Sequence, residues 1–288
     1  MSTQPLCRLV MPSARAGRRA ARRRVAVGVV IMAGALGVLA WWEMETSTLQ
    51  ARSFSWLAQA LRYDLQPGAG EPLALAAAGP FDERLGYSRI ASFSRRLSDA
   101  SFEVEAQARP SDSMRRAAGF GLYPIYREKT QAGLALLGCD GSVISSFRFP
   151  RHAYPRFEAV PPVLVRSLLY IENRELLDPR YPQRNPAVEW DRLGHAALLQ
   201  AFRALVPGRP PGGSTLATQM EKYRHSPGGR TQSMTEKVQQ MASASLRAYL
   251  HGDQTLAARQ QIVVDYLNTM PLSATIGMGE VFGLGDGM

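Results

Sequence analysis

The stretch that decides the fold is PGGSTLATQMEK, residues 211–222, in which two glycines lead into a hydroxyl pair and then into a helix-like run. One interpretation is structural: the glycines turn the chain, Ser214 or Thr215 caps a helix, and the helix begins. The other is chemical, because a glycine-led helix N-terminus presents free N–H groups and a partial positive charge that suit a phosphate. Lys222, about two turns further on, would add a positive charge. These twelve residues leave both interpretations open.

The sequence from residue 161 onward has the hydrophobic spacing of helices. PPVLVRSLLYIENREL begins on a proline pair, and Leu164, Leu168 and Ile171 follow one face of the helix that it predicts. The later runs MTEKVQQMASASLRAYLHG and RQQIVVDYLN have the same kind of spacing. We therefore expect a helical domain in the second half of the chain.

Residues 43–150 carry mixed signals. The run Ser53–Leu65 is helix-like, whereas two β-prone runs flank the pair Asp140-Gly141, which is typical of a hairpin turn. A small α+β segment is the resulting expectation, and no chemistry is assigned to it.

The first 42 residues predict a membrane anchor. Seven arginines and no acidic residue fall within residues 1–24, and the run Val25–Trp42 that follows carries no charge. As a helix this run spans ~27 Å, close to the ~30 Å hydrocarbon core of a bilayer. The positive-inside rule places the arginines in the cytoplasm and the chain from residue 43 outside it. A cleaved signal peptide is the alternative, but the run is long for one and no A-x-A site follows.

Composition and residue spacing argue against nucleic-acid binding and against a metal site. The basic arm contains no aromatic residue and the remaining chain is only mildly basic, so we expect no nucleic-acid partner. Cys7 and Cys139 fall on opposite sides of the anchor and cannot pair within one chain. Neither they nor the four scattered histidines have the spacing of metal ligands, so no metal-ligating residue is assigned.

Glu172 is the candidate catalytic base. It follows the apolar run from Leu168 to Ile171, at the border of the buried face of the predicted helix. A carboxylate partly withdrawn from water accepts a proton more readily and can act as a base near neutral pH. The alternative is a solvated glutamate one step round the helix.

The order and spacing of IENREL, GGSTLATQMEK, EKVQQM and IVVDYLN resemble the family 51 glycosyltransferases, the peptidoglycan transglycosylases of bacterial cell walls. The resemblance covers about residues 161–271. Its most specific part is the second family motif, G-G-S-T-I-T-Q-Q-L-x-K-N, which this sequence matches at Gly212, Gly213, Ser214, Thr215, Gln219 and Lys222.

The first family motif, E-D-x-x-F with a following H-x-G-x-D, is matched less closely. Glu172 takes the place of the family's catalytic glutamate, but Asn173 replaces the aspartate and Leu176 the phenylalanine. Glu189 is the best match to the later aspartate.

The remaining motifs also depart from the family. Of R-K-x-x-E, Lys237 is kept and Gln240 stands where the family has its second glutamate. The I-L-E-x-Y-L-N motif keeps Asn268 but has Val264 in place of its glutamate. The fifth motif is missing, so we expect the chain to stop within the domain.

The resemblance implies a mainly α, lysozyme-like transglycosylase domain at residues 151–288, incomplete at its end. It would follow a cytoplasmic arm (1–24), a single transmembrane helix (25–42) and the small α+β segment (43–150). The implied location is the inner membrane, with the N-terminus cytoplasmic and the catalytic domain periplasmic.

The resemblance also implies polymerisation of lipid II with inversion at the donor sugar. Glu172 would remove a proton from the acceptor 4-hydroxyl, and undecaprenyl diphosphate would leave, steadied by basic side chains and often by Mg²⁺ or Mn²⁺. The alternative function is a catalytically impaired relative that binds lipid-linked glycan or scaffolds other cell-wall synthesis proteins. The substrate-binding residues that the motifs predict are Gly213, Ser214, Thr215, Gln219, Lys222, Lys237, Gln240 and Asn268.

Overall fold

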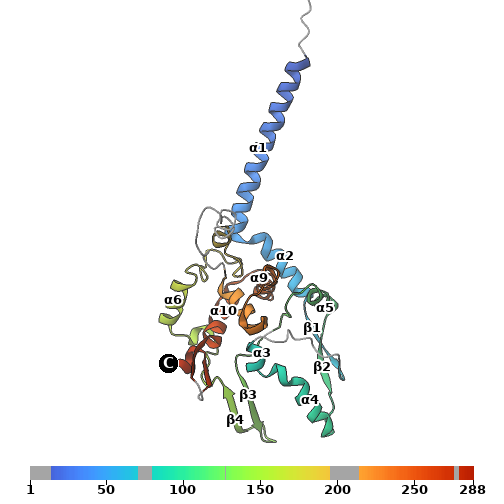
Figure 1. The fold of residues 1–288 in the computed structure, drawn as a ribbon, viewed down its shortest axis with the longest axis vertical. Helices are drawn as coiled ribbons and strands as arrows, with labels where there is room; N and C mark the ends of the chain where they lie inside the picture. The colour runs from blue at the N-terminus through green and yellow to red at the C-terminus, as the bar shows by residue number, and fades with distance from the viewer. Residues whose placement is uncertain (1–13, 71–79, 127, 195–213, 276–278) are drawn as a thin grey trace, which may run out of the picture. The chain divides into compact units, whose positions relative to one another are not determined.

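The protein forms two compact units, Met1–Glu45 and Thr46–Met288, which we call unit 1 and unit 2. Unit 1 is occupied by the helix α1 (Ala14–Thr46), whose apolar side chains from Val25 to Trp42 are exposed. Within α1, residues 22–46 are long and apolar enough to cross a membrane. The predicted span 25–42 lies inside this segment. The computed structural model describes residues 14–70, 80–126, 128–194, 214–275 and 279–288 (Figure 1).

The first part of unit 2 mixes short helices and strands, as expected for a small α+β segment. Its strands form two antiparallel pairs, β1 with β2 and β3 with β4. In chain order the elements are α2 (Thr48–Ala60), β1 (Tyr63–Pro67), α3 (Pro80–Arg84), α4 (Ile90–Asp99), β2 (Ala106–Pro110), α5 (Asp112–Gly119), β3 (Ala132–Leu137) and β4 (Val143–Phe149).

Two predictions for this part have different outcomes. The hairpin is confirmed: β3 and β4 flank Asp140-Gly141, and Gly141 has the positive φ of 79° that favours glycine. The helix predicted over Ser53–Leu65 is wrong at its end, because α2 stops at Ala60 and Tyr63 begins β1. The cause is non-local, since β1 pairs with β2 about forty residues later.

The second part of unit 2 is helical, as predicted. One further antiparallel pair, β5 with β6, lies near its end. The elements are α6 (Pro162–Ile171), α8 (Leu216–His225), α9 (Met234–Ala248), α10 (Leu256–Thr269), β5 (Pro271–Thr275), β6 (Gly279–Phe282) and α11 (Leu284–Gly287). The mainly α fold is that of the lysozyme-like class.

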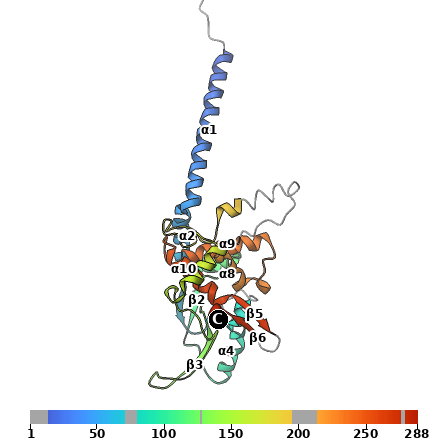
Figure 2. The same ribbon diagram turned by 90° about the vertical axis from the view of Figure 1, so that its left-hand side faces the viewer.

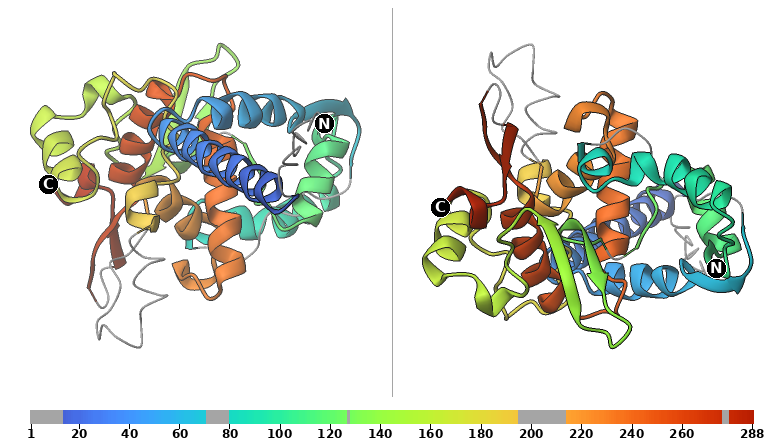
Figure 3. Two further views of the ribbon diagram at one scale, coloured as in Figure 1. Left: turned by 90° about the horizontal axis from the view of Figure 1, so that it is seen from above. Right: turned by 90° about the horizontal axis from the view of Figure 1, so that it is seen from below.

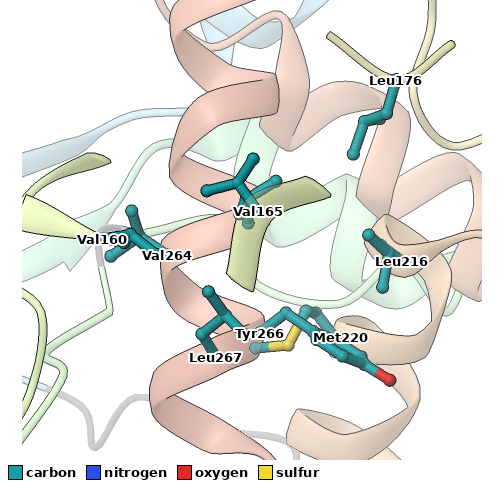
Figure 4. Close-up of a cluster of buried hydrophobic side chains, with 9 residues drawn as sticks. Val160, Val165, Leu176, Leu216, Met220, Val264, Tyr266 and Leu267 are labelled. Carbon is teal, nitrogen blue, oxygen red and sulfur yellow. The ribbon is translucent and has the colours of Figure 1, made fainter. Parts of the chain in front are cut away.

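Helix α8 is the centre of this part. It packs against α3, α9 and α10, and Figure 2 shows it close to α9 and α10. Leu216 and Met220 of α8 join a core with side chains of α10, and Figure 4 shows these side chains meeting between the helices. Full burial of such a side chain contributes about 1.5–3 kcal/mol. The buried members are Val160, Val165, Leu176, Leu216, Met220, Val263, Val264, Tyr266 and Leu267.

Helix α6 meets this core with a stripe that differs from the predicted one. Leu164 and Leu168 pack against the core as expected, and the buried Val165 lies between them. Ile171, predicted for the same face, is 74% exposed. The helix ends at Ile171, so its last residue extends beyond the part of α6 that the core covers.

Candidate active site

Glu172 follows α6 directly as its C-cap residue and is half-buried. Its carboxylate Oε2 accepts a hydrogen bond from Nε2 of Gln219 on α8, at 3.0 Å. Its backbone carbonyl accepts another from Arg192, at 2.7 Å. Arg192 and Gln219, which lie 20 and 47 residues further along the chain, thus hold this glutamate at the end of its helix.

The negative charge of Glu172 affects the pKa of two neighbouring side chains, Tyr266 and Glu189. Burial, and then the negative charge of Glu172, raises the pKa of Tyr266 to about 12. Burial also raises the pKa of Glu189, opposed by Arg192 and by the hydrogen bond that Asn173 donates at 2.6 Å. Glu172 therefore has a neutral phenol and a second carboxylate as neighbours.

The free oxygen of Glu172 sets what the residue can do. Gln219 occupies Oε2, and within the described ranges no group donates a hydrogen bond to Oε1. An oxygen in this state can accept a proton from a ligand hydroxyl while the amide keeps the carboxylate in place. The arrangement leaves one oxygen of an oriented carboxylate open to a ligand.

A pair of lysines forms a second centre. Lys237 of α9 donates from Nζ to Oγ of Ser214 at 2.5 Å. Burial, and then the charge of Lys222, lowers the pKa of Lys237. In the part of the chain that the structure describes, no carboxylate forms an ion pair with either lysine. Two ammonium groups held near each other beside a hydroxyl favour binding of an anion.

Helix α8 connects the two centres. Most of its positions are buried, but Gln219 and Lys222, three residues apart, remain partly exposed. Side chains at i and i+3 lie on one side of a helix. The carboxylate of Glu172, which is bonded to Gln219, and the side chain of Lys222 therefore lie on one side of α8.

Thr215 has the structural role that the glycine-led motif allowed. Its Oγ1 accepts from the backbone N–H of Thr218, and the Thr218 hydroxyl accepts from the N–H of Thr215, which makes a capping box. Thr215 is the cap, and the neighbouring Ser214 is the residue that meets Lys237. Gly213 lies outside the described residues.

Gln240 and Asn268 are predicted ligand-binding residues whose amides serve other partners. Each is 1% exposed. Gln240 donates to Oγ of Ser226 at 2.9 Å, and Asn268 holds the backbone N–H and C=O of Tyr154 at 2.8 and 2.9 Å. The structure thus uses both side chains to join segments of the fold.

Arg192 is the residue that the sequence analysis missed. Besides holding the backbone of Glu172, it forms an ion pair with Glu189 at 2.7 Å. The spacing of three residues between Glu189 and Arg192 on a helix was the available signal. No pattern in the sequence predicts its hydrogen bond to the backbone carbonyl of Glu172.

The described residues hold no group of three or more histidine, cysteine or acidic side chains that could bind a metal ion. Glu172 and Glu189 are the carboxylates nearest the site, and Gln219, Asn173 and Arg192 already contact them. These residues do not fit a dedicated metal site.

Comparison with known proteins gives one match. The transglycosylase family model matches residues 140–287, just over half of the chain. No curated protein and no solved structure matches the chain. The match includes α6, α8, α9 and α10, and so contains Glu172 and the lysine pair.

Proposed function

The chain belongs to the transglycosylase family, a family of peptidoglycan glycosyltransferases, and from this premise we propose that it polymerises the glycan of lipid II at a membrane. The observation that carries the proposal is the shared face of α8. On it, the Gln219-bound carboxylate of Glu172 and the Lys222–Lys237 pair lie on one side of the same helix.

Glu172 is the general base in this proposal. Its Oε1 takes the proton of the acceptor 4-hydroxyl while the acceptor oxygen forms a bond to C1 of the donor sugar. The bond from C1 to the diphosphate breaks, and its electron pair leaves with the diphosphate. Gln219 keeps the other carboxylate oxygen occupied, so that Oε1 faces the hydroxyl.

The lysine pair receives the leaving diphosphate. Lys222 and Lys237 repel each other until an anion lies between them, so their charges stabilise the diphosphate more than they stabilise the empty site. Ser214, already bonded to Lys237, supplies a hydroxyl. Gly213 lies outside the described residues, and its part in binding the phosphate stays a prediction from the sequence motif. Among the described residues no group could hold the Mg²⁺ or Mn²⁺ that the family resemblance implies, so no residue is assigned to a cation.

Unit 1 supplies the membrane attachment in this proposal. α1 contains the apolar segment 22–46, and the arginines at its start favour a cytoplasmic N-terminus. Unit 2 would then meet lipid II at the outer face of the inner membrane. Other cell-wall synthesis proteins are the proposed protein partners.

The test is Glu172→Gln, assayed with labelled lipid II and the full chain extracted from membranes. The amide keeps the size of the side chain but cannot take a proton, so polymerisation should fall by ~10²–10⁴-fold while lipid II binding stays within a factor of a few. Glu158→Gln, on an exposed glutamate near α6, is the matched control and should keep full activity.

A specific observation favours the alternative, a relative that binds lipid-linked glycan without polymerising it. Gln240, at the position of the family's second glutamate, is buried and bonded to Ser226, so it offers no carboxylate to the substrate. Binding of lipid II by the wild-type protein without any polymer would establish this alternative and reject the catalytic proposal.

A further inference from the structure

Helix α2 follows the apolar segment 22–46 after a single residue, Ser47. Ser47 has a φ of 55°, a left-handed conformation that ends one helix before the next begins. Consecutive Cα atoms are about 3.8 Å apart, so α2 starts within about 8 Å of the end of this segment. If the segment crosses a membrane, the covalent chain therefore keeps the start of α2 at the membrane surface.

One face of α2 is fixed to the rest of unit 2. Ala51, Ala58 and Leu61 are each at most 2% exposed, and Phe54 stacks on Tyr249 with the ring centroids 5.9 Å apart. These contacts pack α2 against α9, and Figure 3 shows α2, in light blue, near the outer edge of unit 2 both from above and from below. α2 is thus a rigid part of unit 2 and not a free linker.

The opposite face of α2 is apolar and exposed. Trp56 is 75% exposed and Leu49 is 58% exposed. At about 100° per residue, these two side chains lie about 20° apart around the helix, on the side opposite Ala58. Leu57, 36% exposed, widens the same surface. We call Leu49, Trp56 and Leu57 the apolar face of α2.

The residue types on and beside the apolar face are those that bilayer surfaces favour. Tryptophan is enriched at the membrane–water interface because its ring is apolar and its N–H is polar. α2 contains no acidic residue, and its one charged side chain, Arg52, is exposed. Arg52 lies about 60° from Leu49 around the helix, at the flank of the apolar face. An arginine in this place can lay its stem on apolar surface and extend its guanidinium to lipid phosphates.

The tether distinguishes the apolar face of α2 from other exposed apolar side chains of unit 2. Ile144 on β4, for example, is 71% exposed, but it lies almost a hundred residues after segment 22–46. Chain connectivity does not hold Ile144 at a membrane, whereas it does hold the start of α2 there. The lipid surface is therefore the occupant that the sequence order supplies for the apolar face.

We propose that α2 lies along the membrane surface, with its apolar face in the headgroup region and Arg52 at lipid phosphates. The inference rests on the membrane attachment in the proposed function. Amphipathic helices of this kind bury their apolar face about 5–10 Å into the boundary between headgroups and acyl chains. Because α2 packs against α9, which carries Lys237, this contact holds the lysine of the candidate active site in one orientation to the bilayer.

The experiment places one environment-sensitive fluorophore at a time on the full chain in phospholipid nanodiscs. The two cysteines of the chain are first removed by Cys7→Ser and Cys139→Ser. Trp56→Cys then carries the label on α2, and Ile144→Cys is the matched control because the two side chains are similarly exposed. Val38→Cys, in the apolar segment of α1, reports whether the anchor is inserted. The quenchers are a lipid with a nitroxide near its headgroup, and iodide in the water.

The label at position 56 should be quenched by the nitroxide lipid and protected from iodide, and the label at position 144 should show the reverse. Leu49→Glu puts a carboxylate on the apolar face, and a charge resists leaving water. It should therefore shift the label at position 56 towards quenching by iodide. Because Leu49 is exposed, the same variant should unfold at the wild-type temperature in detergent. No lipid II is present, so the result does not depend on whether the protein polymerises glycan.

The label at position 38 separates the possible failures. If the nitroxide lipid quenches it while position 56 is quenched by iodide as position 144 is, the chain is anchored but α2 stands in water, and the proposal is overturned. Protection of position 56 from both quenchers would show that another protein segment covers the apolar face, which also overturns it. Absence of nitroxide quenching at position 38 would reject the anchor, and with it both this inference and the membrane part of the proposed function.

Discussion

Lys237 has an environment that departs from that of an ordinary surface lysine. Lys237 is half-buried, bonded to Ser214, and close enough to Lys222 for like-charge repulsion to lower its pKa. A bound anion between the two ammonium groups would reduce this repulsion. A carboxylate of the protein paired with either lysine would have the same effect, but the described residues form no such ion pair. The proposed diphosphate binding should therefore have a measurable signature.

The signature is a pH dependence. Binding needs Lys237 protonated, and its pKa is lowered, so diphosphate affinity should decline with rising pH before an ordinary lysine with a pKa of about 10.4 would titrate. Lys222→Ala removes the second cause of the lowering, so it should weaken binding at pH 7 yet move the alkaline decline to higher pH. The measurement is lipid diphosphate affinity from pH 7 to pH 10.5. Identical profiles for both proteins would contradict the coupling.

Helix α8 contributes residues to the candidate active site, to a cavity and to the hydrophobic core. One side carries the polar residues of the candidate active site, the opposite side lines a cavity, and the core covers most of the remainder. Its start is fixed by Thr215 and Thr218, and its interior includes the buried charge of Glu221.

Removing the cap tests the start of α8. Thr215→Ala deletes the acceptor for the N–H of Thr218 and should lower the free energy of unfolding by about 1 kcal/mol. Thr215→Ser keeps the hydroxyl and should restore most of this loss. Thermal unfolding of the three proteins gives the comparison, together with lipid II binding at a temperature where all are folded. A large loss of binding in the folded Thr215→Ala protein would mean that Thr215 also contacts the substrate.

The buried charge of Glu221 makes α8 sensitive to acid. Burial alone would raise the pKa of Glu221, but Arg247 and Arg224 lower it to about 2, below the ordinary value of 4.5. A lowered pKa in the folded state stabilises the protein above pH 4.5, and this contribution is lost as the pH falls towards 2. The unfolding midpoint in urea should fall across that window.

Glu221→Gln is the matching variant. It leaves Arg224 and Arg247 without their shared carboxylate, so it should cost about 3–5 kcal/mol at pH 7. Because this variant has nothing to titrate at that position, its stability should depend less on pH between 4.5 and 2. An unchanged pH dependence would assign the acid sensitivity to other carboxylates.

In the proposed function, unit 1 lies in the membrane and unit 2 lies in water. α1 exposes its apolar side chains all round, which suits a bilayer and not water. Unit 2 has its own hydrophobic clusters and is the part that the transglycosylase match covers from residue 140.

Membrane topology tests this division. A reporter that works only outside the cytoplasm should be active when fused after residue 60, and a cytoplasmic reporter at the same position should be silent. The intact chain should sediment with membranes and resist extraction with high salt. A soluble product that begins near residue 43 would show a cleaved signal in place of an anchor.

The sequence by itself determined what local patterns encode. The uncharged run 25–42, the Asp140-Gly141 turn and the glycine-led start of α8 each depend on residues within a few positions of one another. The motif order led to the transglycosylase family and to Glu172, because spacing along a chain survives substitutions such as Gln240.

Tertiary structure alone decided which side chains meet. Gln219 reaches Glu172 across 47 residues and Lys237 reaches Ser214 across 23. The first contact depends on where the end of α6 lies, and the second on how α9 packs against α8. The β1–β2 pairing and the exposure of Ile171 are of the same kind. Periodicity gives the face of a helix, but the neighbours that cover that face come from distant parts of the chain, so no local pattern can identify them.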